Sequence, residues 1–215
     1  MRLLNTPGVY RAQDDTDLLV GCLGRERIGS GTAVLDLGTG SGAVALAAAG
    51  TGARVTAVDV SRRALAAARL NSVLNGRWIR LRHGDLLEPV RGCRFDLVVS
   101  NPLYVPAAEA VVPVRGLARA WDAGHDGRAL VDRICRQAPG VLGPGGVLLM
   151  VHSALCGVER SLDLLEQAGL GAEVVARHRI PFGPVLTGRA AWLEDQGLIA
   201  PGERMEELVV IRGVR

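Results

Sequence analysis

Lysine is absent from this sequence of 215 residues, and all 25 of its basic side chains are arginine. Together with 22 acidic residues they give a net charge of +3, and no stretch concentrates the positive charge as a nucleic-acid-binding surface would. Nucleic acid is therefore a disfavoured partner, although it is not excluded. Aromatic residues make up only 3% of the chain, so each of them can be considered individually.

Cysteines are few and scattered through the sequence. Cys22, Cys93, Cys135 and Cys156 form no C-x-x-C pair, and no histidine lies at metal-ligand spacing, so we expect reduced thiols and no metal site. No hydrophobic run approaches the roughly 20 residues that cross a membrane. The first residues turn polar too early for a secretory signal, so a cytoplasmic protein without membrane contact is expected.

Hydrophobic residues make up 48% of the chain, which suffices for a sizeable core and argues against disorder. The length suits one α/β domain that spans residues 1–215. Within it we expect a loop and a helix in residues 1–30, an active-site loop in residues 105–124, and an insertion at residues 181–204 before the last strand.

Apolar runs and helical patterns alternate along the chain, which predicts a mostly parallel sheet with helices on both faces. The expected strands lie at 34–37, 54–59, 78–81, 95–100, 147–151, 173–176 and 207–211. The expected helices begin near Asp14, Ala43, Ser61, Asp126 and Val158, and residues 143–146 are typical of a turn. Because no periodic helix separates the last two strands, the seventh is expected to run antiparallel.

The first expected strand leads into the glycine-rich segment Gly38-Thr39-Gly40-Ser41-Gly42. Glycines carry no Cβ, so a ligand can lie against the backbone, facing the amides that open the next helix. Asp36 precedes the first glycine, where a carboxylate would repel a pyrophosphate and would suit a cationic group. Asp59 ends the next strand, where an acid can accept hydrogen bonds from ribose hydroxyls.

This pattern resembles motif I of the class I S-adenosylmethionine-dependent methyltransferases, rather than the turn of a dinucleotide-binding dehydrogenase. The resemblance implies a Rossmann-like fold with seven strands, S-adenosyl-L-methionine as the cofactor and S-adenosyl-L-homocysteine as its product. Asp85, at the end of the third strand, would then accept a hydrogen bond from the exocyclic amine of adenine.

The segment Asn101-Pro102-Leu103-Tyr104 follows the fourth strand and resembles the N-P-P-[YF] motif of methyltransferases that act on planar nitrogens. The Asn101 side-chain oxygen and the Pro102 carbonyl can accept the two N–H donors of an amide, which directs its nitrogen toward the sulfonium methyl group. Tyr104 can stack on the planar group. Leu103 replaces the second proline, which removes one fixed φ and leaves both acceptors in place.

The combination resembles the HemK/PrmC family of protein glutamine N5-methyltransferases, which modify the GGQ glutamine of peptide release factors, and in particular its short branch. The resemblance implies a protein or peptide acceptor held at Asn101, with Pro102 and Tyr104. It implies a cofactor held by Thr16, Asp36, Gly38, Gly40, Gly42, Asp59, Asp85, Leu86 and Asn101. That branch often works with a small zinc-binding activator protein near the third strand, which Trp78 and Ile79 could contact, although core packing explains these two residues as well.

Three other functions fit the same residues. An adenine-N6 methyltransferase of DNA or RNA uses the same Asn-Pro chemistry, but it needs phosphate contacts and a steep salt dependence. A small molecule or a biosynthetic peptide could be the acceptor instead. A binding module that keeps the cofactor without catalysis is the third, and Leu103 is its only support.

The insertion at residues 181–204 leaves two interpretations open. Trp192 and Leu198 belong to an apolar face between turns at Gly183-Pro184 and Pro201-Gly202, and a short helix is expected there. That helix either packs on the sheet edge or forms a lid that selects the acceptor. The two interpretations differ in whether removal of the Trp192 side chain lowers stability or acceptor turnover.

Overall fold

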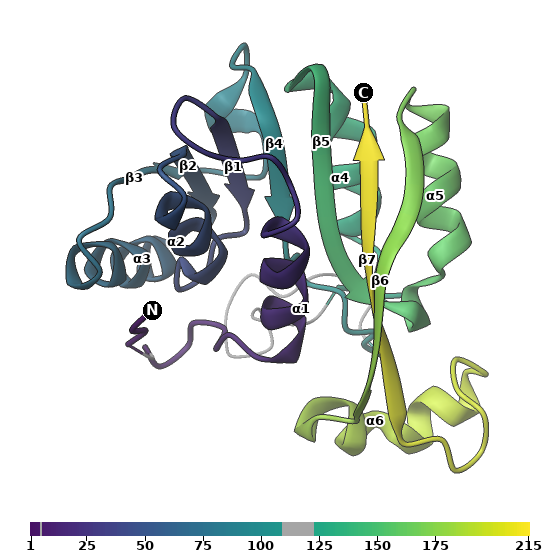
Figure 1. Cartoon of the computed structure of the whole chain (residues 1–215). Helices are drawn as coiled ribbons and strands as arrows, with labels where there is room; N and C mark the ends of the chain where they lie inside the picture. Colours follow the sequence, from purple (N-terminus) through teal and green to yellow (C-terminus); the bar gives the residue numbers. More distant parts are fainter. Residues whose placement is uncertain (5, 109–122) are drawn as a thin grey trace.

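The structure is a computed structural model that describes residues 1–4, 6–108 and 123–215. Seven strands form one sheet in the order β3-β2-β1-β4-β5-β7-β6 (Figure 1). Their bounds are Ala33–Leu37 (β1), Arg54–Asp59 (β2), Ile79–His83 (β3), Phe95–Ser100 (β4), Leu142–Ser153 (β5), Gly171–Pro181 (β6) and Met205–Val214 (β7). Strand β7 runs antiparallel to β5 and β6, while the pairs from β1 to β5 are parallel. The expected fold class is therefore confirmed.

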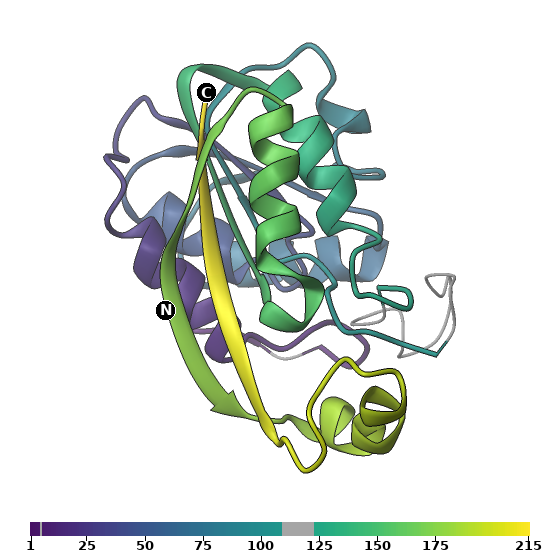
Figure 2. The same cartoon turned by 90° about the vertical axis from the view of Figure 1, so that its right-hand side faces the viewer.

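Helices cover both faces of the sheet. Their bounds are Asp14–Leu23 (α1), Ala43–Gly50 (α2), Arg62–Leu74 (α3), Val131–Gln137 (α4), Val158–Gln167 (α5) and Pro184–Asp195 (α6). Alternate residues of the central strands enter two buried clusters, one shared with α1 and α2 and one with α4 and α5. Figure 2 shows α4 and α5 side by side on one face. In the part of the chain that is described, no helix is both long and apolar enough to span a membrane.

Two expectations about local structure are wrong. The helix expected from Asp126 begins at Val131, because Asp126 accepts a hydrogen bond from the Arg128 amide in a turn that needs a positive φ at Gly127. Residues 143–146 were expected to form a turn before the fifth strand, but they belong to β5, which extends from Leu142 to Ser153. The pairing register between β4 and β5 shifts at these residues. Glycine-rich backbone at this point lets the extended strand kink and pair with the end of the chain.

Strands β6 and β7 pair along their whole length, from Gly171 opposite Val214 to Pro181 opposite Met205. Strand β5 accompanies β7 only as far as Leu208, so the end of this hairpin extends past the sheet and carries α6 (Figure 1). Helix α6 was expected within residues 181–204. It lies beyond the edge of the sheet at which the parallel strands end. A separate expectation, the active-site loop at residues 105–124, falls mostly outside the described residues.

Candidate active site

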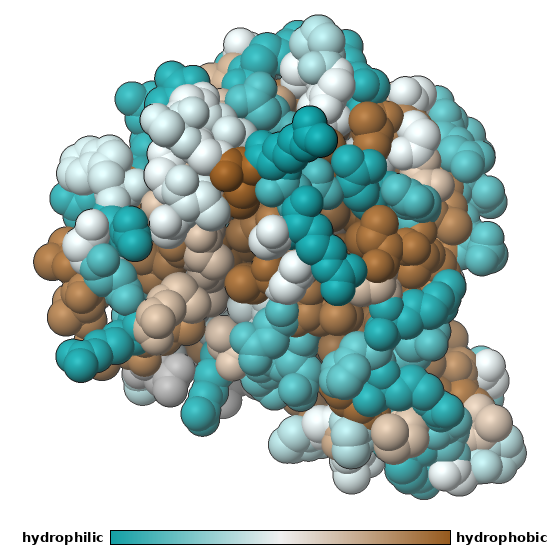
Figure 3. Space-filling view, viewed as in Figure 1, coloured by the Kyte–Doolittle hydropathy of each residue, from teal (hydrophilic) through white to brown (hydrophobic). Residues whose placement is uncertain are grey.

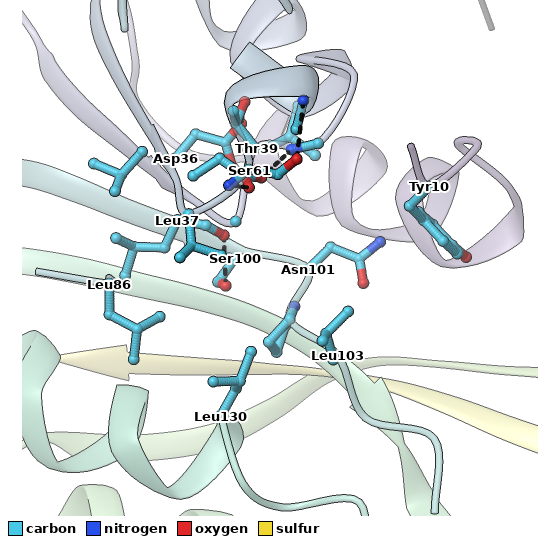
Figure 4. A pocket seen from close by; sticks show the side chains of 18 of the residues that line it. Tyr10, Asp36, Leu37, Thr39, Ser61, Leu86, Ser100, Asn101, Leu103 and Leu130 are labelled. Atoms are coloured by element: carbon cyan, nitrogen blue, oxygen red, sulfur yellow. Dashed lines mark hydrogen bonds between the residues drawn. The ribbon is translucent and has the colours of Figure 1, made fainter. Parts of the chain in front are cut away.

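A cavity of about 1000 Å³ opens at the carboxyl ends of the parallel strands. Open α/β sheets bind their ligands at this edge. The residues that the sequence singled out and that line the cavity are Thr16, Asp36, Gly38, Gly40, Asp59, Asp85, Leu86, Asn101, Pro102 and Tyr104. Gly42 is the one predicted site residue that is not among them. Figure 4 shows several of these side chains around the cavity.

The three glycines of the turn differ in what their missing side chains permit. Gly38 and Gly40 have φ values of 71° and 53°, and a Cβ on either would meet no atom within 4 Å. Their backbone is therefore open to a ligand on the cavity side. A Cβ on Gly42 would lie 3.1 Å from the Ala68 Cβ, so this glycine lets α2 pack closely against α3.

Asp36 is almost completely buried beneath the glycine turn, with 1% of its surface exposed. Its Oδ2 accepts hydrogen bonds from the Thr39 hydroxyl at 2.6 Å and from the Ala45 amide at 3.1 Å. Burial raises the pKa of Asp36 to about 6 in spite of these two bonds, and the Asp59 charge adds to the shift. A cation placed beside Asp36 would stabilise its ionised form.

Asp59 links the end of β2 to the glycine turn. Its Oδ2 accepts the Gly40 amide at 2.9 Å, and its Oδ1 accepts the Ser61 amide at 2.7 Å. Asp59 also lines the cavity, where a carboxylate is a hydrogen-bond acceptor for the hydroxyl groups of a ligand. Asp59 thus holds the turn in shape and can also bind a hydroxyl group in the cavity.

Asp85 and Leu86 form the next part of the wall. Asp85 Oδ2 lies 2.6 Å from an Arg133 amino group, an ion pair that the sequence did not predict. Leu86 has a φ of 45°, the one positive value of a non-glycine residue in the described chain. A leucine in this conformation is strained, and such strain is frequent where a protein shapes a ligand site.

Asn101 stands at the end of β4, and its amide nitrogen donates to the Thr16 hydroxyl at 3.2 Å. This contact joins the start of α1 to the segment after β4. In Figure 4 the Asn101 side chain points toward Tyr10, and Leu103 lies beside it. With the nitrogen engaged by Thr16, the Asn101 side-chain oxygen is left to accept a hydrogen bond in the cavity.

Asp15 connects the only two tyrosines of the sequence. Its Oδ2 accepts the Tyr10 hydroxyl at 2.7 Å and the Tyr104 hydroxyl at 2.9 Å. Burial, together with the Asp15 charge, raises the pKa of both phenols above their usual range. The Tyr104 backbone is also fixed, because its carbonyl accepts the Cys156 thiol and a Cβ at Gly127 would collide with it.

Glu206, at the start of β7, is a buried acid that sequence reasoning missed. It is 6% exposed, and its Oε1 has no hydrogen-bond partner among the described residues. Burial raises the pKa of Glu206 to about 7, a bond to the Ser153 side chain opposes the shift, and the Asp15 charge adds to it. The sequence predicted a helix that begins near Asp14 and a stacking role for Tyr104, and it did not predict that Asp15 joins the two tyrosines or that Glu206 lies close by.

The site fits the methionine and ribose portions of S-adenosylmethionine. Asp36 suits the ammonium group of its methionine portion, Asp59 suits ribose hydroxyls, and the open backbone at Gly38 and Gly40 leaves room beside them. The cavity volume of about 1000 Å³ is at the upper end of the usual range for small-molecule sites, which also leaves space for an acceptor group. The fold and the site define a class I S-adenosylmethionine-dependent methyltransferase.

Comparison with known proteins gives the family. The methyltransferase small domain matches residues 1–114. A protein of Methanocaldococcus jannaschii named as an N5-glutamine methyltransferase is 34% identical over 177 residues, which cover 82% of this chain and 88% of that protein. The chain belongs to the methyltransferase small domain family and, within it, to the HemK/PrmC-type methyltransferases.

Two further matches describe how far the similarity extends. A release factor glutamine methyltransferase of Geobacter sulfurreducens is 40% identical over 171 residues, which are 76% of this chain and 60% of that longer enzyme. The solved E. cuniculi Mtq2–Trm112 complex, responsible for methylation of the eRF1 translation termination factor, contains a chain with the same fold. Its TM-score is 0.67 at 23% identity, with 97% of this chain and 99% of that chain covered.

Proposed function

We propose that this protein transfers a methyl group from S-adenosyl-L-methionine to the side-chain amide of a protein glutamine, of the kind found in peptide release factors. The observation that carries the proposal is the Asn101 amide at the cavity, with its nitrogen bound to Thr16 and its oxygen available. The names of the relatives support glutamine as the acceptor. A cytoplasmic location, where translation takes place, is part of this proposal.

An amide acceptor fits the chemistry of this segment. A primary amide nitrogen carries two N–H donors, and the Asn101 oxygen and the Pro102 carbonyl supply two acceptors on consecutive residues. Binding both donors orients the nitrogen and increases its electron density. Tyr104 is held by Asp15 and Cys156, so it gives the planar amide a fixed wall.

In the proposed mechanism, Asp36, Asp59, Asp85 and Leu86 would hold the cofactor, which would supply an electrophilic methyl group. Asn101 and Pro102 align the amide nitrogen for in-line displacement. The amide nitrogen would take the methyl group and release one proton to solvent, which gives N5-methylglutamine and S-adenosyl-L-homocysteine. Because positioning accounts for most of the rate, the chain needs no strong general base.

In the direct test, the purified protein is incubated with labelled S-adenosylmethionine and a release factor that contains the GGQ sequence. We expect one methyl group on the glutamine, detected by peptide mass spectrometry. The same release factor with glutamate in place of that glutamine is the matched control and should stay unlabelled. Labelling of DNA or RNA that falls steeply with salt would overturn the proposal in favour of base methylation.

A second part of the proposal is a small activator protein that binds beside β3. Strand β3 is an edge strand, and Trp78 just before it is 75% exposed, which rules out core packing as its role. Ile79 was expected to be available with it, but it is 1% exposed and packs in the core, so it is not part of this surface. Leu70, Val73 and Leu74 of α3 are exposed nearby in sequence. Hydrophobic side chains gather over α3 in Figure 3, as they do at protein interaction sites.

The partner named in the E. cuniculi complex provides the probe for this surface. Co-expression of the wild-type chain with a Trm112 counterpart from the organism that encodes this chain should yield a stable complex. Trp78→Glu should abolish co-purification while the isolated chain keeps its affinity for S-adenosylhomocysteine. Co-purification that is unaffected by Trp78→Glu would exclude the surface next to β3, and loss of the complex on zinc chelation would indicate a zinc-binding partner.

A further inference from the structure

The orientation of the Asn101 side-chain amide decides whether a hydrogen-bond acceptor or a donor faces the methyl acceptor in the cavity. Its oxygen must face the cavity if it is to accept an N–H from the acceptor, whereas a reversed amide would present a second donor. A terminal amide can rotate between these orientations, so a neighbouring group has to fix it. Asn101 lies at the end of β4, and the only hydrogen bond of its side chain among the described residues goes to Thr16.

The Thr16 hydroxyl can both donate and accept. It has a single hydrogen, which it donates to Asp15 Oδ1 at 3.2 Å. Because this hydrogen goes to Asp15, the Thr16 hydroxyl offers Asn101 only a lone pair. Asn101 must therefore turn its nitrogen toward Thr16, at 3.2 Å, and its oxygen toward the cavity.

The Asp15 carboxylate is held by four hydrogen bonds. Oδ1 also accepts the Thr16 amide at 2.6 Å, and Oδ2 accepts the hydroxyls of Tyr10 and Tyr104. Asp15 is 2% exposed and Thr16 is 4% exposed, so solvent has little access to these bonds. A carboxylate with four donors in a buried site has no freedom to change its partners.

We propose that the Asp15–Thr16–Asn101 relay, in which each residue fixes the hydrogen-bonding direction of the next, sets Asn101 in the orientation that accepts an N–H from the acceptor. Thr16 and Asp15 are thus positioning residues for methyl transfer. The inference rests on the proposed function and adds to the cofactor contact that the sequence predicted for Thr16.

Three substitutions test the relay. Thr16→Val removes the hydroxyl at nearly constant shape and should lower kcat at saturating cofactor by roughly 10- to 100-fold. Thr16→Ser keeps the hydroxyl and should restore most of the rate. Thr51→Val is the matched control, because the Thr51 hydroxyl donates to the Ala48 carbonyl at the surface, away from the cavity. An unchanged kcat in Thr16→Val, with only a weaker cofactor affinity, would overturn the inference and leave Thr16 as a cofactor residue.

A measurement without an acceptor separates this inference from the proposed function. In an NMR spectrum of asparagine-labelled protein, the Asn101 side-chain NH₂ is assigned by its loss in Asn101→Asp. We expect a nuclear Overhauser contact between this NH₂ and Thr16 in the wild type, which Thr16→Val should abolish. Absence of the contact in the wild type would refute the relay even if glutamine is methylated. A relay seen by NMR in a protein that methylates no glutamine would refute the proposed function alone.

Discussion

Two walls of the cavity are held together by contacts of very different range. On the cofactor side, formed by Asp36, the glycine turn and Asp59, the side-chain hydrogen bonds of the two acids join residues two to nineteen positions apart. On the acceptor side, formed by Asn101 to Tyr104 and their partners, Thr16 and Asp15 are reached across 85 and 89 positions. The first wall is a local motif, whereas the second is assembled from distant parts of the chain.

The difference extends to charge. Asp36 and Asp59 each have hydrogen-bond partners within their own strand–turn–helix units. Asp15 and Glu206 come from opposite ends of the chain and are buried close enough for their charges to interact. We infer that the cofactor side can keep its geometry through local backbone structure, whereas the acceptor side depends on the packing of α1 and β7 against the end of β4.

Asn101→Ala should break the acceptor side alone and have the largest effect. We expect kcat to fall by roughly 10²- to 10³-fold, because the acceptor nitrogen loses both alignment and an oxygen acceptor. Calorimetry should show an affinity for S-adenosylhomocysteine within about tenfold of the wild type, since a lost hydrogen bond costs about 0.5–1.5 kcal/mol. Asn75→Ala, which removes an asparagine that bonds Arg2 away from the cavity, is the control. A large loss of cofactor affinity in Asn101→Ala would mean that the two sides are not separable.

Asp59→Ala should instead disrupt the cofactor side of the cavity. Loss of a charged acceptor should weaken cofactor binding by roughly 1–3 kcal/mol, measured by calorimetry. Asp96→Ala is a matched control, because Asp96 accepts the Ala33 amide at the opposite edge of the sheet. An unchanged affinity in Asp59→Ala would remove Asp59 from the cofactor site.

Glu206→Gln tests the buried charge on the acceptor side. The Glu206 pKa is raised from an ordinary value of 4.5 to about 7, so the folded protein retains a proton that the unfolded chain releases. The associated stability is complete below pH 4.5 and is lost as the pH rises toward 7. Glutamine stays neutral, so the variant should gain about 1–3 kcal/mol over the wild type between pH 4.5 and pH 8.

Urea unfolding at several pH values measures this gain. Glu207→Gln, one residue along β7, is the control, because Glu207 pairs with Arg177 at the surface. A Glu206→Gln protein that is less stable than the wild type at pH 8 would show that Glu206 is stabilised as an anion.

Trp192→Ala should have the smallest effect and sharpens the role of α6. The Trp192 side chain is half-buried beside the α6 cluster, 6.1 Å from the His125 ring, so its loss should cost about 1–2 kcal/mol of stability, less than a fully buried tryptophan. If α6 borders the acceptor entrance, the acceptor KM should rise about threefold to tenfold with cofactor affinity unchanged. An unchanged acceptor KM would favour a helix that only packs on the hairpin.

The α6 segment shows where the two interpretations of residues 181–204 now stand. Its apolar cluster packs against Val105 and Leu155, and Arg189 donates to the Pro106 carbonyl at 2.7 Å. The helix therefore contacts the chain immediately after the Asn-Pro segment. These contacts make packing and acceptor selection compatible roles for one helix, and the Trp192→Ala kinetics separate them.

The sequence by itself determined which candidate site residues follow which strand, and that these residues lie at one edge of the sheet. Residues 34–42 and the run that ends at Asp59 are local patterns, and alternation of strands and helices forces their ends to one edge. The bounds of β2, β4 and the start of α2 agree with the expectation, because each depends on apolar runs and glycines within a few residues. The Asn101 segment was found for the same reason.

Only the tertiary structure decided which groups surround that segment. The convergence of Tyr10, Asp15, Tyr104 and Glu206 depends on the packing of α1 and on the position of β7 between β5 and β6, which no local pattern predicted. Burial of Glu206, and with it its raised pKa, arises from neighbours on other elements. Gly42, assigned to the cofactor from its motif, faces Ala68 instead, because the spacing of glycines fixes backbone freedom while helix packing fixes what lies beside it.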